Sequence, residues 1–261
     1  MSLIPALMSG RKLEHDALST GQFVSYSPAN YVELFSDFIQ DVGETAVLPW
    51  VLTKSTSSGN ATTDFIDAPD GVIRLLHTSG DNEVQACLLS LGGTNAISPT
   101  KEVIFEARVK ITLDTHTTFD ADSNYLVFVG MVTAGTAVGT GATVVSATAD
   151  NVGFQLGSDS GTLSIFCESD DGTNDNDLKD SGIDFVSDTY VTLKIDMTDI
   201  GNVRFFVDGV EANNGNLFDM SNIDAADYLE PFILFSRTNN GGTEQDHSMD
   251  IDYVKCTWKR S

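Results

Sequence analysis

The segments Tyr190-Val-Thr-Leu-Lys-Ile-Asp-Met197 and Val203-Arg-Phe-Phe-Val-Asp-Gly209 decide the fold class. Apolar side chains occupy every second position from Val191 to Met197. Strict alternation of this kind is typical of a strand with one face in a hydrophobic core. Asp208-Gly209 is a two-residue hairpin signal, because glycine adopts a positive φ at no steric cost. The stretch therefore predicts long strands joined by tight turns.

Similar patterns recur along most of the chain, separated by short runs of Gly, Asp, Asn and Ser. Many short strands with almost no helix predict an all-β protein with a two-sheet antiparallel sandwich, in a single domain over residues 21–261. The further predicted strands are Trp50–Lys54, Gly71–His77, Glu83–Leu91, Glu102–Leu113, Tyr125–Val132, Val152–Leu156, Thr162–Glu168, Phe232–Arg237 and Met249–Trp258.

Three segments are less regular. Apolar residues in Tyr31–Val42 fit helical spacing, yet part of this segment also alternates as a strand does, and its aromatic content favours a strand. Periodicity alone leaves this choice open. Ser55–Thr63 is expected to be a polar loop, and Asp219–Tyr228 is the one place where a short helical turn is expected.

The charge balance excludes two classes of partner. Lys and Arg total 14 and Asp and Glu total 38, which gives a formal net charge of −24. Nucleic-acid phosphates and anionic membranes repel such a polyanion, and no apolar run approaches the about 20 residues that cross a bilayer. We therefore expect no nucleic-acid and no membrane partner. The acidic residues form a solvated coat, or they attract cations or a basic protein surface.

Cys87, Cys167 and Cys256 are widely spaced and odd in number, which argues against a disulfide framework or a zinc motif. Each lies in an apolar run, where a free cysteine behaves as a small core residue. We expect all three to be unpaired and buried, as is typical of folding in a reducing compartment. The N-terminal residues also lack the pattern of a secretory signal.

Several segments follow one another in a familiar order. These are Phe105-Glu-Ala-Arg108, Phe128-Val-Gly130, Phe206-Val-Asp-Gly209 and Asp252-Tyr-Val254. The order resembles the concanavalin A-like (laminin G-like) jelly rolls found among the structural proteins of tailed bacteriophages, over roughly residues 30–260. The resemblance implies a jelly-roll sandwich and makes Tyr31–Ile39 its first strand.

The resemblance also implies a virion component that is assembled in the cytoplasm of a bacterial host. The preferred role is a non-enzymatic capsid-decoration or head-fibre protein, a homo-oligomer that binds the major capsid protein or another virion protein. The alternative is a carbohydrate-binding module of a phage tail or a cell-surface protein, with a host glycan as its partner. Because one fold hosts many functions, the site itself has to decide between them.

Residues 1–20 show little periodicity and precede the first aromatic-rich strand. We interpret them as an N-terminal arm outside the core, with a frayed terminus as the alternative. Arg11 and Lys12 are two of the few basic residues of an acidic chain. In a virion protein they would dock the arm onto acidic groups of the particle.

The sequence does not predict an enzyme. Glycoside hydrolysis needs paired carboxyl groups at a fixed separation across the sugar, and the chain lacks the Glu-x-Asp-x-x-Glu strand of β-glucan hydrolases with this fold. Asp250 and Asp252 share a face of the last predicted strand but lack a third carboxylate. The four histidines stand alone, outside any metal or nucleophile pattern. We therefore expect no catalytic residue.

Calcium is the one cofactor for which the sequence offers ligands. Oxygen-bearing side chains alternate or cluster in two acidic segments, which suits a hard cation, although Asp and Asn are also ordinary turn formers. The candidate ligands are Asp120, Asp122 and Asn124 in the first segment, and Asp170, Asp171 and Asp175 in the second. A glycan site would instead need exposed aromatic rings beside polar groups, and its candidates are Tyr125, Tyr190, Tyr228 and Trp258.

Overall fold

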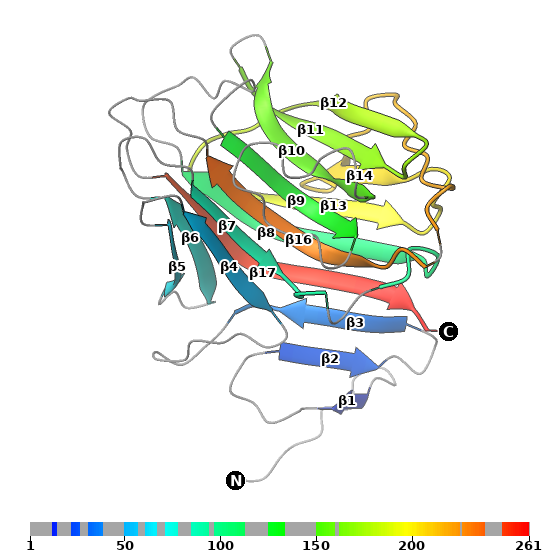
Figure 1. Cartoon of the computed structure of the whole chain (residues 1–261), viewed down its shortest axis with the longest axis horizontal. Helices are drawn as coiled ribbons and strands as arrows, with labels where there is room; N and C mark the ends of the chain where they lie inside the picture. The colour runs from blue at the N-terminus through cyan, green and yellow to red at the C-terminus, as the bar shows by residue number, and fades with distance from the viewer. Residues whose placement is uncertain are drawn as a thin grey trace.

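The computed structural model describes residues 12–14, 22–26, 31–38, 50–56, 61–66, 71–77, 85–93, 97–112, 125–133, 150–159, 162–224, 226–237 and 247–260. These residues form seventeen strands in two sheets, and all the strand pairs are antiparallel (Figure 1). The described residues contain no helix long and apolar enough to cross a membrane. The predicted all-β, two-sheet antiparallel sandwich is confirmed.

Sheet A is built around one long strand, β17 (His247–Lys259). One side of β17 pairs with β8 (Val103–Thr112); the other side pairs first with β6 (Val72–His77) and then with β3 (Tyr31–Ser36). Figure 1 shows β17 as the red arrow that runs across the sheet. The remaining strands of sheet A are β1 (Lys12–Glu14), β2 (Gln22–Tyr26), β5 (Ala61–Ile66), β13 (Tyr190–Met197), β14 (Arg204–Val207) and β15 (Val210–Glu211).

Sheet B has seven strands, and its centre is formed by apolar residues. In spatial order they are β12 (Asp175–Asp184), β11 (Thr162–Asp170), β10 (Asn151–Asp159), β9 (Tyr125–Thr133), β16 (Leu229–Arg237), β7 (Gln85–Ser90) and β4 (Val51–Thr56).

The main core lies between the two sheets. In β8, buried residues alternate with half-exposed ones along the whole strand, as a one-sided strand requires. Phe154 of β10 and Phe205 of β14 meet edge-to-face with ring centroids 5.2 Å apart, and Phe205 meets Phe218 at 4.7 Å. Burying a ring of this size stabilises the fold by about 1.5–3 kcal/mol.

Sheet B also carries an apolar cluster on its far side. Its members alternate along their strands with residues of the main core, and all are buried: Ala86, Leu88, Phe128, Val132, Phe232 and Leu234. The centre of sheet B is therefore apolar on both faces, and every residue of β7 is buried. Sheet A differs, because the face of β8 opposite the core is polar and half-exposed.

The local predictions had mixed outcomes. Asp208 and Gly209 connect β14 and β15 with φ angles of 49° and 79°, so the hairpin is confirmed. Tyr31–Ser36 is a strand, as the resemblance implied, but it is not the first one, because β1 and β2 precede it in the chain. Ile39, the predicted end of this strand, lies outside the described residues. The loop predicted over Ser55–Thr63 is wrong at both ends, because β4 extends through Thr56 and β5 begins at Ala61. Its middle, residues 57–60, lies outside the described residues.

The segment Asp219–Tyr228 contains hydrogen-bonded turns in place of the expected helical turn. The Ile223 amide donates to the Met220 carbonyl at 3.2 Å, and the Asp227 amide donates to the Asp224 carbonyl at 2.9 Å. Both bonds join residues three apart, so each closes a single turn.

None of the three cysteines, Cys87, Cys167 and Cys256, forms a disulfide, and all three are buried, as predicted. Of the proposed arm, residues 12–14 form β1, which pairs with β2 at the edge of sheet A. Lys12 therefore lies in an edge strand, while Arg11 lies outside the described residues. The proposed role of Arg11 and Lys12 in docking the arm onto a particle stays a prediction.

Candidate functional site

The outward side of sheet A gathers charged and aromatic side chains from six strands. They occupy the positions that alternate with core residues, and cross-strand register brings them side by side. We call this surface the polar face. It consists of Glu33, Phe35, Arg74, Glu106, Arg108, Lys110, Tyr190, Lys194, Asp196, Arg204, Phe206, Asp250, Asp252, Tyr253, Lys255 and Lys259.

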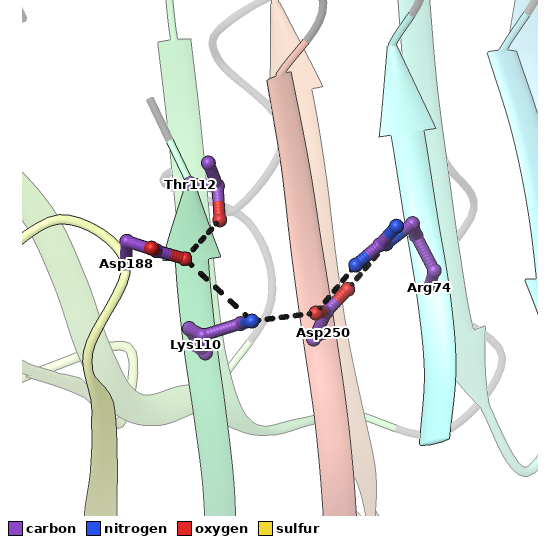
Figure 2. Close-up of polar contacts among 5 residues, drawn as sticks. All are labelled: Arg74, Lys110, Thr112, Asp188 and Asp250. Carbon is purple, nitrogen blue, oxygen red and sulfur yellow. Dashed lines mark hydrogen bonds and ion pairs between the residues drawn. The ribbon is translucent and has the colours of Figure 1, made fainter. Parts of the chain in front are cut away.

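Asp250 of β17 lies at the centre of one row across four strands. Its cross-strand neighbours are Arg74 of β6 and Lys110 of β8. Arg74 donates to both carboxylate oxygens, from Nε at 2.6 Å and from Nη2 at 2.8 Å, and Lys110 Nζ lies 3.2 Å from Oδ2. Figure 2 shows Asp250 between these two cations, with Asp188 and Thr112 beyond Lys110. The carboxylate is thus fixed from both sides.

The pKa values of three members of this row, Arg74, Lys110 and Tyr190, are raised. The hydrogen bond to Asp250 raises the pKa of Arg74. Burial works against the Lys110 ammonium, but its hydrogen bond and attraction to Asp250 outweigh burial and raise its pKa. Burial, and then the charge of Asp250, raise the pKa of Tyr190. All three side chains keep their protons at neutral pH.

A β-bulge at Asp252 adds a second carboxylate to the polar face. Ile251 pairs with Val109 and Tyr253 pairs with Arg108, so Asp252 is the extra residue of β17. A bulge of this type places two consecutive side chains on one side of the sheet. Asp252 forms an ion pair with Arg108, whose guanidinium lies 4.4 Å from the centre of the Tyr190 ring.

Tyr253, the residue after the bulge, lies on the polar face between Glu106 and Phe35. Its hydroxyl donates to Glu106 Oε1 at 2.9 Å, and its ring lies 5.8 Å from that of Phe35, measured between centroids. Burial, followed by the hydrogen bond to Glu106, raises the pKa of Tyr253 to about 12. The hydroxyl therefore remains a donor throughout the physiological range.

Further ion pairs extend the polar face to both sides. Arg204 Nη2 lies 2.7 Å from Asp196 Oδ2, and both Arg204 and Lys194 lie over the ring of Phe206. Burial opposes ionisation of Asp196, but hydrogen bonds from Thr198 and the charge of Arg204 lower its pKa. On the other side, Lys255 pairs with Glu33 at 3.3 Å and Lys259 pairs with Glu102 at 2.5 Å.

The four aromatic residues that the sequence offered for a glycan site lie in different places in the structure. Tyr190 belongs to the polar face. Trp258 packs partly buried against the core, and Tyr228 is exposed just before β16. Tyr125 begins β9, but its side chain lies outside the described residues. Asp250 and Asp252 do share one face, yet each is bound by a cation.

Sequence reasoning missed the cationic members of the polar face. Arg108 and Lys110 occupy outward positions of the predicted strand Glu102–Leu113, in which apolar residues alternate with polar ones, so alternation alone could have found them. Arg74 is the single charged residue in an apolar strand, which is a weaker signal. Its contact with Asp250, 176 residues away, depends on the register.

The calcium candidates are not assembled into a site among the described residues. Asp120, Asp122 and Asn124 lie outside them. Asp175 is the first residue of β12, so this part of the acidic segment is a strand and not a loop. Asp171 accepts hydrogen bonds from the amides of Thr173, Asn174 and Asn222. No group of three or more His, Cys, Asp or Glu that would hold a metal occurs in the described part of the chain. Calcium binding stays a prediction.

Glu168 of β11 lies away from the polar face, on the side of sheet B opposite the main core. Only 6% of its surface is exposed. Burial, and then the charges of Asp177 and Asp175, raise its pKa to about 8. This carboxyl therefore holds a proton near neutral pH.

No protein-family model and no curated protein sequence matches the chain. Among solved structures, a protein of unknown function, SO2946 from Shewanella oneidensis MR-1, aligns with TM-score 0.50 and 13% identity over 89% of this chain and 88% of that one. The carbohydrate recognition domain of Emp47p aligns with TM-score 0.53 and 10% identity over 84% and 92%. The fold is that of the concanavalin A-like sandwiches.

A third solved structure is the carbohydrate esterase vb_24B_21 from the Shiga toxin-encoding bacteriophage phi24B. It aligns with TM-score 0.47 and 13% identity over 79% of this chain and 90% of that one. At these identities the likenesses concern the fold alone, and function has to be argued from the polar face.

Proposed function

We propose that the chain is a carbohydrate-binding component of a bacteriophage particle, and that it binds glycans on the polar face. The main support is the arrangement of this face, where the rings of Tyr190, Tyr253 and Phe206 lie among charged groups held by ion pairs. Ligand sites typically combine aromatic surface with a few precisely placed polar groups. A sugar presents an apolar ring face and directional hydroxyl groups, which match both parts.

The fixed geometry of the polar groups favours binding. Arg74 is oriented by two hydrogen bonds to Asp250, and Arg108 is oriented by Asp252 and by the Tyr190 ring. Side chains that are already ordered lose little conformational entropy when a ligand arrives. The polar face thus offers donors in defined directions on strands and not on loops.

We propose binding without turnover. Hydrolysis by two carboxyl groups requires one that holds a proton and another that is free to act as base or nucleophile. Asp250, Asp252 and Asp196 of the polar face each form an ion pair with a cation, so none of the three is free to act as base or nucleophile.

The phage setting of this proposal rests on the sequence resemblance. In that setting the protein partners are the major capsid protein or another virion protein, with further copies of this chain in a homo-oligomer, and assembly takes place in the bacterial cytoplasm. Mass spectrometry of purified phage particles tests this part: recovery of the chain with the particles supports it, and recovery only in the host lysate contradicts it.

A glycan array followed by titration calorimetry tests the binding proposal. Tyr190→Ala removes a ring from the polar face, and we expect it to weaken binding about tenfold, as for the loss of an aromatic contact with its buried area. Tyr228→Ala is the matched control, because Tyr228 is exposed but lies outside the polar face. Equal loss in both variants, or no loss in either, would contradict the proposed site.

A further inference from the structure

In most ion pairs on and beside the polar face, the cation is more exposed to solvent than its carboxylate partner. In six of the seven ion pairs between described residues, the cation is more exposed than its carboxylate. The exposed fraction of the side chain is 36% for Arg74 against 3% for Asp250, and 45% for Arg204 against 10% for Asp196. The exception is Asp188, which is more exposed than Lys110. A ligand therefore meets the cations first.

The polar face also concentrates the few basic residues of the chain. The chain has 14 Lys and Arg residues in total. Seven of them lie on this one surface: Arg74, Arg108, Lys110, Lys194, Arg204, Lys255 and Lys259. The same surface holds five carboxylates, those of Glu33, Glu106, Asp196, Asp250 and Asp252, so its formal charge is 7 − 5 = +2 on a chain of net charge −24. This small positive charge separates it from the acidic remainder.

The acidic remainder does not cancel this local charge. At physiological salt the Debye length is about 8 Å, so distant carboxylates are screened while groups in contact with a ligand are not. An arginine side chain also has more N–H donors than one carboxylate accepts. In the described hydrogen bonds Arg74 uses Nε and Nη2 on Asp250, and its Nη1 amino group is a further donor. A planar carboxylate or a sulfate suits the remaining N–H groups.

We infer that the polar face binds acidic glycans, which carry carboxylate or sulfate groups, in preference to neutral ones. This inference rests on the proposed function and names its ligand class. The cations already pair with carboxylates, but a neutral sugar would cover their outward N–H groups without supplying an anionic acceptor for them, which is unfavourable. An acidic sugar supplies that charge at the place where the cations are exposed.

A glycan array with matched pairs tests the inference on the full-length protein. Each acidic glycan, whether sialylated, uronate-containing or sulfated, is printed beside its neutral counterpart, such as polygalacturonate beside its fully methyl-esterified form. We expect binding at least tenfold tighter to the acidic member of a pair. Equal binding to both members would overturn the inference and leave the proposed function standing. Binding to no glycan would overturn both.

Poly-L-glutamate separates glycan recognition from simple attraction to a polyanion. We expect it to bind at least tenfold more weakly than the acidic glycan, because it lacks the sugar rings that contact the aromatic side chains. Binding as tight as that of the glycan would show that charge alone is sufficient, and would overturn the inference.

Charge removal on the polar face provides the residue-level test. We expect Arg204→Gln to weaken binding of the acidic glycan about tenfold, the effect of losing one charge-assisted hydrogen bond, with little change for a neutral glycan. Arg204→Lys keeps the charge and should retain most of the affinity. Lys179→Gln on β12 is the matched control outside the polar face.

Should Arg204→Gln fail to fold, Lys255→Gln replaces it. The carboxylate that Lys255→Gln leaves without its cation is Glu33, which is more exposed than Asp196, so this variant should be less destabilised. Unchanged acidic-glycan affinity in a folded variant would contradict the inference.

Discussion

The Arg74–Asp250 pair should respond asymmetrically to mutation. The Asp250 side chain is 3% exposed and that of Arg74 is 36% exposed. In Arg74→Gln, a buried carboxylate loses its two-point partner and keeps only Lys110, 3.2 Å away. In Asp250→Asn, the cations that lose their partner reach water. We therefore expect Arg74→Gln to be the more destabilising change, although it removes the more exposed residue.

The magnitudes follow from burial. Stranding a buried charge costs about 3–5 kcal/mol, and the remaining contact with Lys110 places Arg74→Gln near about 3 kcal/mol, at the lower end of that range. Asp250→Asn loses charge-assisted hydrogen bonds from hydrated cations, which costs about 1–2 kcal/mol. The double variant removes the stranded carboxylate, so it should be more stable than Arg74→Gln alone by about 1 kcal/mol.

Urea unfolding measures these differences. The free energy of unfolding is obtained from tryptophan fluorescence, with the denaturant slope m as the check that all variants unfold in the same way. Equal costs for the two single variants, or a double variant whose cost is the sum of both, would refute the argument that the burial of Asp250 controls the pair. The same variants extend the binding tests, because both alter the centre of the polar face.

Three further predictions concern the rest of the molecule. Glu168 has a pKa raised from 4.5 to about 8 by burial and neighbouring aspartates, so the folded state holds a proton that the unfolded state releases; its stabilising effect is full below pH 4.5 and is lost as the pH rises through about 8. Glu168→Gln should match the wild type near pH 4 and exceed its stability by about 5 kcal/mol near pH 9 in urea unfolding; a constant difference would contradict this. A Cβ on Gly130 would lie 2.2 Å from the Val152 carbonyl oxygen, so Gly130→Ala should cost about 2–3 kcal/mol of unfolding free energy; a neutral effect would be inconsistent with the close strand contact. A chain that starts at Gly21 loses β1, and thermal melting should place it within about 4 °C of the full chain; a larger loss would assign residues 1–20 to the core.

Alternation along the sequence predicts the one-sided strands well. Half-exposed and buried residues alternate throughout β8 and from Tyr190 to Ile195 in β13, so the inward and outward sides of these strands can be assigned from the sequence alone. β12 could not be predicted in this way, because it is a polar edge strand whose burial follows no alternation. Its acidic side chains resemble a cation-binding loop, which led to Asp175 being placed in one.

The candidate site depends on two features that a single sequence does not reveal. Register places Arg74 beside Asp250, and no local pattern specifies which residues face each other across strands distant in the chain. The bulge at Asp252 brings Asp252 and Tyr253 to the same side of the sheet, whereas strict alternation would separate them. The fold was therefore predictable from alternation, but the polar face required the strand pairing.

The measurement that tests the account most directly is an NMR titration of isotope-labelled protein with an acidic oligosaccharide bound on the array. The account predicts chemical-shift changes at the arginine Nε groups of Arg74, Arg108 and Arg204 and at the backbone of β8, β13 and β17. Changes confined to the strands of sheet B, with these arginine signals unmoved, would contradict the assignment of the polar face as the glycan-binding site.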